Sequence, residues 1–232
     1  MKPALDCTQR AATDDVRSPE LIYLAAAAMA IVSSVMGWTV MHFVFKPLTM
    51  LLAIGLVLVR ARRSGDVGQP DVLLVAALVA SLAGDVFLML PGGYFIPGLA
   101  SFLIAHLFYI ALFQQGVPWF PSRLALGAAL TVGAAMYGWV WLSLNDPLLK
   151  VAVASYVTVI SLMVAQAIGR ATMRRNARST AIALGACIFM LSDSLIAINR
   201  FVQPVPLVSL WVLTSYYMAQ FLMVHNLTSK SP

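Results

Sequence analysis

The chain has 232 residues, of which 61% are hydrophobic and 10% are charged, and its mean hydropathy is +0.87. Soluble proteins carry roughly 25% charged residues, so this composition excludes a soluble globular protein and indicates an integral membrane protein. The net charge of +6 would suggest a nucleic-acid partner in a soluble domain. Basic residues in cytoplasmic loops account for it here, so no nucleic-acid partner is expected.

Eight apolar stretches are long enough to cross a bilayer, since a spanning helix needs roughly 20 mostly apolar residues. Residues 1–20 are polar, without the layout of a signal peptide, and are expected to form a cytoplasmic tail. Residues 21–226 form a single membrane domain, followed by a short cytoplasmic tail at 227–232. The expected fold is an all-α bundle of eight transmembrane helices at 21–40, 43–60, 72–90, 95–113, 123–143, 148–168, 179–199 and 207–226.

The basic residues indicate how these helices are oriented. With eight spans, twelve of the 15 lysines and arginines fall on one side, in the two tails and in the second, fourth and sixth connections. Only Lys150 and Arg200 fall on the other side, and Lys46 lies just inside the second helix. Because basic residues concentrate on the cytoplasmic side, both termini are expected to be cytoplasmic. The short connections favour a bacterial inner membrane.

Two acidic residues lie inside predicted helices, whereas the other seven fall in the tail or in connections. Asp85 follows Ser81-Leu-Ala-Gly, and Asp193 lies in the stretch from Met190 to Phe201. A charged side chain at mid-membrane costs on the order of 2.5–3.5 kcal/mol on insertion scales, so it marks a functional site by default. Both aspartates lie about five residues before the outer ends of their helices. We therefore expect the charged residues to converge on the outer half of the bundle.

Further polar residues recur at helical spacing, which places them on shared helix faces. Asp193 and Arg200, for example, lie seven positions apart. Polar faces of membrane helices turn inward, so the sequence predicts a lined cavity. The polar residues within predicted helices, or at their ends, include Lys46, His106, Tyr109, Tyr156, Asn199, Arg200, Tyr216 and Gln220.

A structural role is the alternative for these residues. Lys46 and Arg200 could neutralise Asp85 and Asp193 one for one and only lock the bundle together. His106 and the polar aromatic residues could act as interhelical hydrogen-bond partners, which stabilise membrane helix pairs by about 0.6 kcal/mol each.

The segments around the two membrane aspartates show a short internal similarity: a small residue, then Asp, then an apolar turn. Two parallel four-helix halves that face each other across a shared cavity would produce such a pattern, as in transporter repeats. The similarity covers only a few residues, so a 4+4 internal repeat and chance are both consistent with it.

Known catalytic arrays are mostly missing. A zinc hydrolase site needs about three His or carboxylate ligands at one depth, whereas His42, His106 and His225 lie at different depths of different helices. Cys7 and Cys187 form neither a disulfide framework nor a metal site. No Gly-x-Ser-x-Gly elbow or Walker loop occurs. No metal and no cofactor is therefore expected.

What remains is a pair of membrane carboxylates with several hydrogen-bond donors. Two carboxylates close together in a low dielectric cannot both ionise easily, so one can serve as general acid and the other as general base. This pairing cleaves glycosidic bonds and other acetal-type centres. The residues alone thus indicate acid/base chemistry on a lipid-soluble molecule.

Five segments, taken in order, resemble the lysoplasmalogenase (YhhN-like) family of small multi-pass membrane hydrolases. They are Lys46-Pro47, Ser81 to Asp85, Gly98 to Tyr109, Ser192 to Phe201 and Tyr216 to Gln220. The resemblance runs from the second to the eighth predicted helix and leaves out the polar tail.

This resemblance implies cleavage of the vinyl ether of lysoplasmalogens, which yields a fatty aldehyde and glycerophosphoethanolamine or glycerophosphocholine. Asp85 and Asp193 are then the expected catalytic residues, one as proton donor and the other stabilising the cation and activating water, with the two roles left open. The lysophospholipid would be bound within the bilayer by the polar residues given above, with Lys46, Arg200 and His106 holding the phosphate or tuning the acids.

Two other functions are consistent with the same residues. Membrane carboxylates and an internal repeat also mark proton-coupled transporters, although few mid-helix Gly or Pro breaks occur and the polar cluster lies toward one side. The other is a lipid-binding membrane protein whose Asp–Lys and Asp–Arg pairs are structural.

Overall fold

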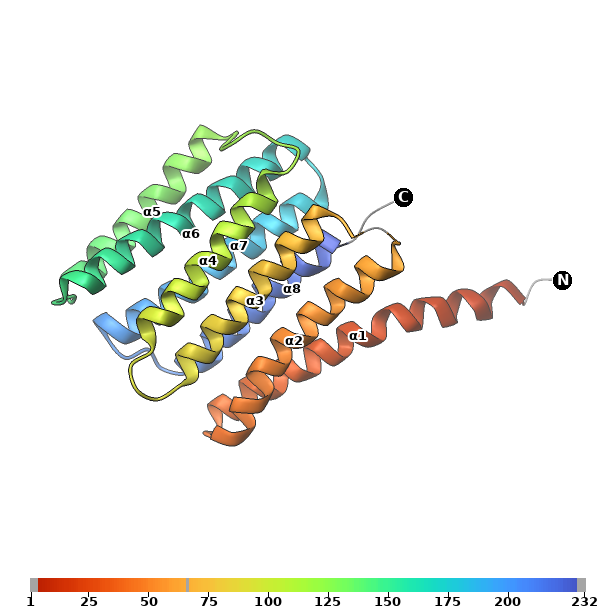
Figure 1. Ribbon diagram of the computed structural model, residues 1–232, viewed down its shortest axis with the longest axis horizontal. Helices are drawn as coiled ribbons and strands as arrows, with labels where there is room; N and C mark the ends of the chain where they lie inside the picture. Colours follow the sequence, from red (N-terminus) through yellow and green to blue (C-terminus); the bar gives the residue numbers. More distant parts are fainter. Residues whose placement is uncertain (1–3, 66, 229–232) are drawn as a thin grey trace.

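The structure, a computed structural model, describes residues 4–65 and 67–228, with side chains described for 19–65 and 67–227. Its regular elements in this part of the chain are all helical, and all eight predicted helices are present (Figure 1). The helices are α1 (Ala4–Val35), α2 (Thr39–Arg63), α3 (Gln69–Met89), α4 (Phe95–Gln114), α5 (Arg123–Trp141), α6 (Pro147–Arg174), α7 (Ala177–Ala197) and α8 (Val208–Thr228), with a π-helical turn, η1 (Ile198–Val202), directly after α7.

The predicted polar tail differs from the expectation in one respect. Residues 4–20 are helical and continue α1, whose first turns project beyond the other helices (Figure 1). Residues 1–3 of this tail and residues 229–232 of the predicted C-terminal tail lie outside the described residues.

Polar residues at the ends of the apolar stretches cap several helices, which explains where these helices begin. The side chain of Asn176 accepts a hydrogen bond from the Ser179 amide at 2.8 Å, and Ser122 caps α5 in the same way. Asp146 caps α6, with Pro147 at the first helical position. These are the residue types that satisfy free amides at helix starts.

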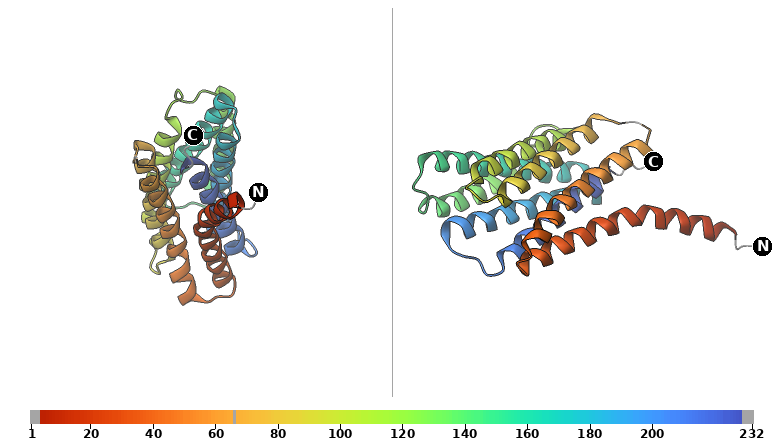
Figure 2. Two further views of the ribbon diagram at one scale, coloured as in Figure 1. Left: turned by 90° about the vertical axis from the view of Figure 1, so that its right-hand side faces the viewer. Right: turned by 60° about the horizontal axis from the view of Figure 1, so that its bottom comes forward.

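The helices run along a common long axis and form a closed ring (Figures 1 and 2). Around the ring α1 packs on α2, α2 on α3, α3 on α4, α4 on α6, α6 on α7, α7 on α8, and α8 on α1. Helix α5 lies outside the ring against α6. Residues from most of these helices meet in one hydrophobic core.

The protein is an integral, multi-pass membrane protein: α2, α3, α4, α5, α6 and the α7–η1 segment are each long and apolar enough to cross a bilayer. The apolar part of α1, Pro19–Val35, is shorter. Helix α8 is not one of these six segments in the described part of the chain; it contains Tyr216, Tyr217 and Gln220, and all three side chains are buried inside the bundle.

Basic side chains gather at one end of the bundle. In the part of the chain with described side chains, eight arginines lie where α2 and α6 end or where α5 and α7 begin, and these helix ends fall together (Figure 1). Lys46, Lys150 and Arg200 lie toward the other end, as does the turn between α3 and α4, where Gly92 and Gly93 adopt positive φ angles.

Candidate active site

Two neighbouring cavities lie toward the end of the bundle opposite the arginine-rich end. The apolar cavity is narrow, with a volume of about 60 Å³, and lies between α4, α5, α6 and α7. The polar cavity is larger, about 290 Å³, and is lined from α1, α2, η1 and α8. Both are bounded by Leu88, Phe95 and Ile196, so they adjoin along a shared wall.

Asp193, near the end of α7, lines the apolar cavity together with Tyr156 from α6. The Tyr156 hydroxyl donates a hydrogen bond to Asp193 Oδ2. The ring nitrogen Nε2 of His106, from α4, lies 3.9 Å from the same oxygen. The Asp193 side chain is 12% exposed. Asp193 therefore presents a carboxyl group to an otherwise mostly apolar cavity.

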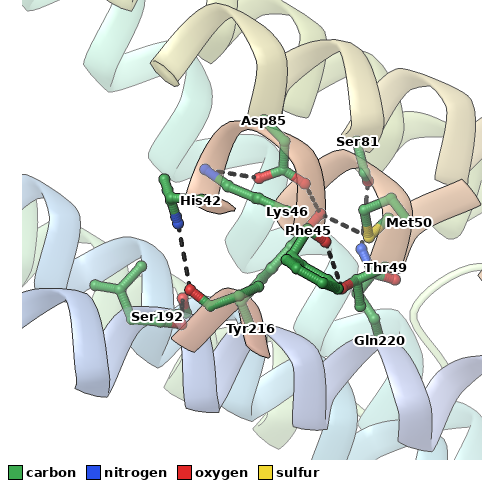
Figure 3. A network of polar contacts seen from close by, with 12 residues as sticks. His42, Phe45, Lys46, Thr49, Met50, Ser81, Asp85, Ser192, Tyr216 and Gln220 are labelled. Carbon is green, nitrogen blue, oxygen red and sulfur yellow. Dashed lines mark hydrogen bonds and ion pairs between the residues drawn. The ribbon is translucent and has the colours of Figure 1, made fainter. Parts of the chain in front are cut away.

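Asp85, on α3, is 2% exposed and has a different environment. Lys46 Nζ, from α2, lies 3.2 Å from Asp85 Oδ1. The Tyr216 hydroxyl, from α8, donates to Asp85 Oδ2 at 2.7 Å and lies 3.3 Å from Met50 Sδ (Figure 3). The lysine thus neutralises this buried carboxylate, and Asp85 itself is not among the residues that line either cavity.

Within the described residues no hydrogen bond joins the two carboxyl groups. An aromatic layer connects their surroundings instead. The Phe189 ring makes edge contacts with Tyr216, the partner of Asp85, at 5.4 Å between centroids and with His106 at 4.9 Å. His106 in turn contacts Tyr156, the partner of Asp193. The two carboxyl groups therefore lie in different surroundings: Asp85 is paired with Lys46, whereas Asp193 faces the apolar cavity.

His106 is fully buried, and in the described part of the chain neither of its ring nitrogens has a hydrogen-bond partner. Buried polar atoms without a partner are rare in proteins and call for a physical reason. Because Asp193 Oδ2 lies 3.9 Å away, a small movement of either side chain would create a hydrogen bond between them.

Tyr109 and Gln220 form a separate interior network. The Tyr109 hydroxyl donates to Gln220 Oε1 at 2.6 Å. Gln220 Nε2 donates to Ser81 Oγ at 3.4 Å (Figure 3). All three side chains are buried and line neither cavity. This network joins α4, α8 and α3, as interhelical hydrogen bonds do.

The polar cavity contains Lys46, Asn199 and Arg200 from the predicted set. The Asn199 side chain accepts a hydrogen bond from the Val205 amide at 3.0 Å, which fixes the connection to α8. The Arg200 guanidinium lies 4.3 Å from the centroid of the Phe95 ring.

The seven-residue spacing suggested that Arg200 shares a face with Asp193, and one structural alternative paired them. Arg200 forms no ion pair with Asp193 among the described residues. The π-helical turn η1 explains this, because its wider turn alters the spacing after Ala197.

Several residues of the two cavities were not predicted. His42 lines the polar cavity, with its ring Nδ1 3.3 Å from the Ala30 carbonyl oxygen. Its spacing of four from Lys46 is a signal that places both on one helix face. Phe102 has the same spacing from His106. Four further residues of the cavities have no such signal: Ser34, Phe95, Ser194 and Ser209.

No cluster of three or more His, Cys, Asp or Glu side chains with metal-binding geometry occurs in residues 4–65 and 67–228. The two cavities instead suit an amphiphile. Lysine and arginine side chains attract an anionic group, and the apolar lining of the adjoining narrow cavity suits the first carbons of a hydrocarbon chain. The Asp193 carboxyl would then face the chain near its junction with the polar part.

Comparison with known proteins gives consistent relatives. The model of the YhhN family matches residues 41–227. The chain is 34% identical over 150 residues to the human protein "Lysoplasmalogenase TMEM86B", covering 65% of this chain and 61% of the human protein. It is 35% identical over 159 residues to the pig TMEM86B lysoplasmalogenase, covering 68% and 64%. It is 29% identical over 211 residues to a lysoplasmalogenase of Mycobacterium tuberculosis, covering 87% and 76%.

The matched stretches thus span less than two thirds of the length of the human and pig relatives. No solved structure is significantly similar to the chain.

Proposed function

This chain belongs to the YhhN family, and we propose that it is a lysoplasmalogenase. The reaction would cleave the vinyl ether of a lysoplasmalogen with water, giving a fatty aldehyde and glycerophosphoethanolamine or glycerophosphocholine. The relatives that carry this name support the substrate class. The observation that carries the proposal is the placement of Asp193 in the wall of an apolar cavity that adjoins a cationic one.

The two cavities give the substrate one orientation. Lys46 and Arg200 would hold the phosphate in the polar cavity, with His42 beside them. The alkenyl chain would lie in the apolar cavity, past the shared wall of Leu88, Phe95 and Ile196. The vinyl ether joins the head group to the chain, so it would cross that wall and come near Asp193.

A carboxylic acid is suited to the first step. Asp193 would transfer its proton to the β-carbon of the vinyl ether, which produces an oxocarbenium ion at the adjacent carbon. The resulting carboxylate stabilises this cation and takes a proton from the water that attacks it. The hemiacetal so formed collapses to aldehyde and alcohol, and Asp193 is again protonated. The Tyr156 hydroxyl orients the carboxyl throughout.

Asp85 would act by positioning Lys46 and would not take part in cleaving the vinyl ether bond. Its ion pair with Lys46 fixes the ammonium group at the polar cavity, and Tyr216 fixes the carboxylate. Asp193, whose neighbours are a tyrosine hydroxyl and a histidine, is the better proton donor because it has no lysine or arginine in ion-pair contact among the described residues. This proposal departs from the division of roles expected from the sequence: Asp193 takes both the proton-donor role and the cation-stabilising, water-activating role, and Asp85 takes neither.

The proposed topology has eight spans with both termini cytoplasmic. The grouping of eight arginines at one end of the bundle supports it, because basic residues concentrate on the cytoplasmic side. The active site would then lie in the outer half of a membrane, which we take to be a bacterial inner membrane. The 4+4 internal repeat stays a prediction.

A substrate comparison with purified protein in detergent tests this function. We expect the protein to release an aldehyde from a vinyl-ether lysolipid. We expect it to cleave neither the ester analogue nor the saturated-ether analogue. Cleavage of the ester alone would indicate a lysophospholipase. Binding without cleavage would favour a lipid-binding protein, and uptake of a solute or of protons into proteoliposomes without aldehyde release would favour a transporter.

A further inference from the structure

Lys46 is an unusual lysine, because its amino group is buried within the membrane domain and still faces a cavity. The residue is 8% exposed. Its Nζ lies 3.2 Å from a carboxylate oxygen of Asp85, and its side chain lines the polar cavity of about 290 Å³. Buried lysines are a known setting for Schiff-base chemistry. Here the neighbouring carboxylate can accept the ammonium proton and can serve as counter-ion to the product.

The proposed reaction would release an aldehyde beside this amino group. The glycerophospho-alcohol is soluble in water and can leave through the polar cavity. The aldehyde keeps its chain in the apolar cavity, with its carbonyl at the wall formed by Leu88, Phe95 and Ile196. Once the phosphate has left, the carbonyl would reach the Lys46 amino group in the polar cavity at the place where the two cavities adjoin.

We propose that Lys46 is a covalent binding site for long-chain aldehydes, which it captures reversibly as an imine with Asp85 as counter-ion. Capture would make the product a slow inhibitor of its own formation. The inference rests on the proposed function for the source of the aldehyde, but the site itself takes any long-chain aldehyde that enters the cavity.

Imine formation needs no reactant other than the aldehyde. Asp85 accepts one proton from the Lys46 ammonium group, and the free amine attacks the aldehyde carbon to form a carbinolamine. Loss of water gives the imine, which takes the proton back from Asp85 and becomes an iminium ion. Water reverses the sequence.

The charge of the site favours the adduct. Modifications that remove the lysine charge would leave Asp85 as an uncompensated buried carboxylate, which is strongly destabilising. An iminium ion keeps the positive charge next to Asp85 Oδ1, so the buried pair is preserved. The Tyr216 hydrogen bond to Asp85 Oδ2 is also retained.

Reductive trapping tests the proposal. Purified protein would be incubated with hexadecanal and cyanoborohydride, digested, and analysed by peptide mass spectrometry. Lys150 is the internal control, because its amino group lies over the Trp141 ring and lines neither cavity. We expect the N-hexadecyl group on Lys46 with at least tenfold higher initial rate than on Lys150, and slower labelling of Lys46 when glycerophosphoethanolamine is present.

The Lys46→Arg variant is the matched control, since arginine keeps a cation beside Asp85 but forms no imine under these conditions. It should show no time-dependent inhibition of its residual aldehyde release after preincubation with hexadecanal, whereas the wild type should show inhibition that is lost on dilution. Labelling of Lys46 no faster than that of Lys150, or equal in detergent-denatured protein, would overturn the proposal. Because hexadecanal is added directly, labelling is independent of whether the protein cleaves a vinyl ether.

Discussion

The two membrane carboxyl groups have different partners. Asp85 is joined to Lys46 and Tyr216, and the whole group is buried. Asp193 is joined to Tyr156 and approached by His106, and it faces a cavity. Substitutions at the two positions should therefore fail in different ways, one through stability and the other through turnover.

Asp85→Asn should destabilise the fold, because it leaves the Lys46 charge buried without its partner. Removing one member of a buried pair costs about 3–5 kcal/mol, measurable as a lower free energy of unfolding in detergent. Adding Lys46→Met should recover most of this loss, since an apolar side chain can replace the charge. A double variant no more stable than Asp85→Asn would show that the pair does not determine stability.

Tyr156→Phe should lower kcat and leave KM nearly unchanged, because it removes the hydroxyl that orients the Asp193 carboxyl. Hydrogen bonds to charged groups contribute about 1.5–3 kcal/mol, so a loss of roughly tenfold or more is expected in steady-state assays. Tyr137→Phe is the control, because the Tyr137 hydroxyl donates to the Lys150 carbonyl at 3.1 Å and is a hydrogen-bond partner of neither Asp85 nor Asp193. Equal effects of the two substitutions would remove Tyr156 from the mechanism.

At the level of helices, the contact between α3 and α4 shapes the site. A Cβ atom at Gly84 would lie 2.5 Å from the Phe102 ring, and one at Gly98 would lie 2.9 Å from Leu88. Phe102 and Leu88 both line the apolar cavity. The two glycines thus allow a close approach of the helices that places these side chains in the wall of the apolar cavity.

Gly84→Ala should push the Phe102 ring toward the apolar cavity. Overpacking of this kind costs about 1–3 kcal/mol, and the narrower cavity should raise KM for long-chain substrates more than for short-chain ones. Gly55→Ala in α2 is the control, because a Cβ there meets nothing within 4 Å. If Gly84→Ala changed KM by the same factor for long-chain and short-chain substrates, Phe102 would have no part in binding the chain.

The helices were predictable because a bilayer demands long apolar stretches, and the capping residues Ser122, Asp146 and Asn176 mark where three of them begin. The helical continuation of α1 through residues 4–20 was missed, since polar composition says little about a helix that projects beyond the bundle. The Lys46–Asp85 ion pair was one of the structural alternatives that the sequence offered, and it is present. The tyrosine partners of the two carboxyl groups were not predicted, because they depend on which helices pack together, and the position of Arg200 depends on the π-turn after α7.

At the scale of the whole molecule, the orientation in the membrane decides which compartment the polar cavity faces. In a background with Cys7→Ser and Cys187→Ala, the exposed positions Gln69 and Ser143 lie at opposite ends of the bundle. A membrane-impermeant maleimide added to intact cells should label Ser143→Cys and should reach Gln69→Cys only after permeabilisation. The reverse pattern would place the active site on the cytoplasmic side.

The most direct test of the account is the rate of aldehyde release from a vinyl-ether lysolipid by Asp193→Asn protein that unfolds at the wild-type temperature. General acid/base groups contribute about 10²- to 10⁴-fold to rates, so we expect a loss in that range with substrate binding retained. Turnover close to that of the wild type would contradict the assignment of Asp193 as the proton donor.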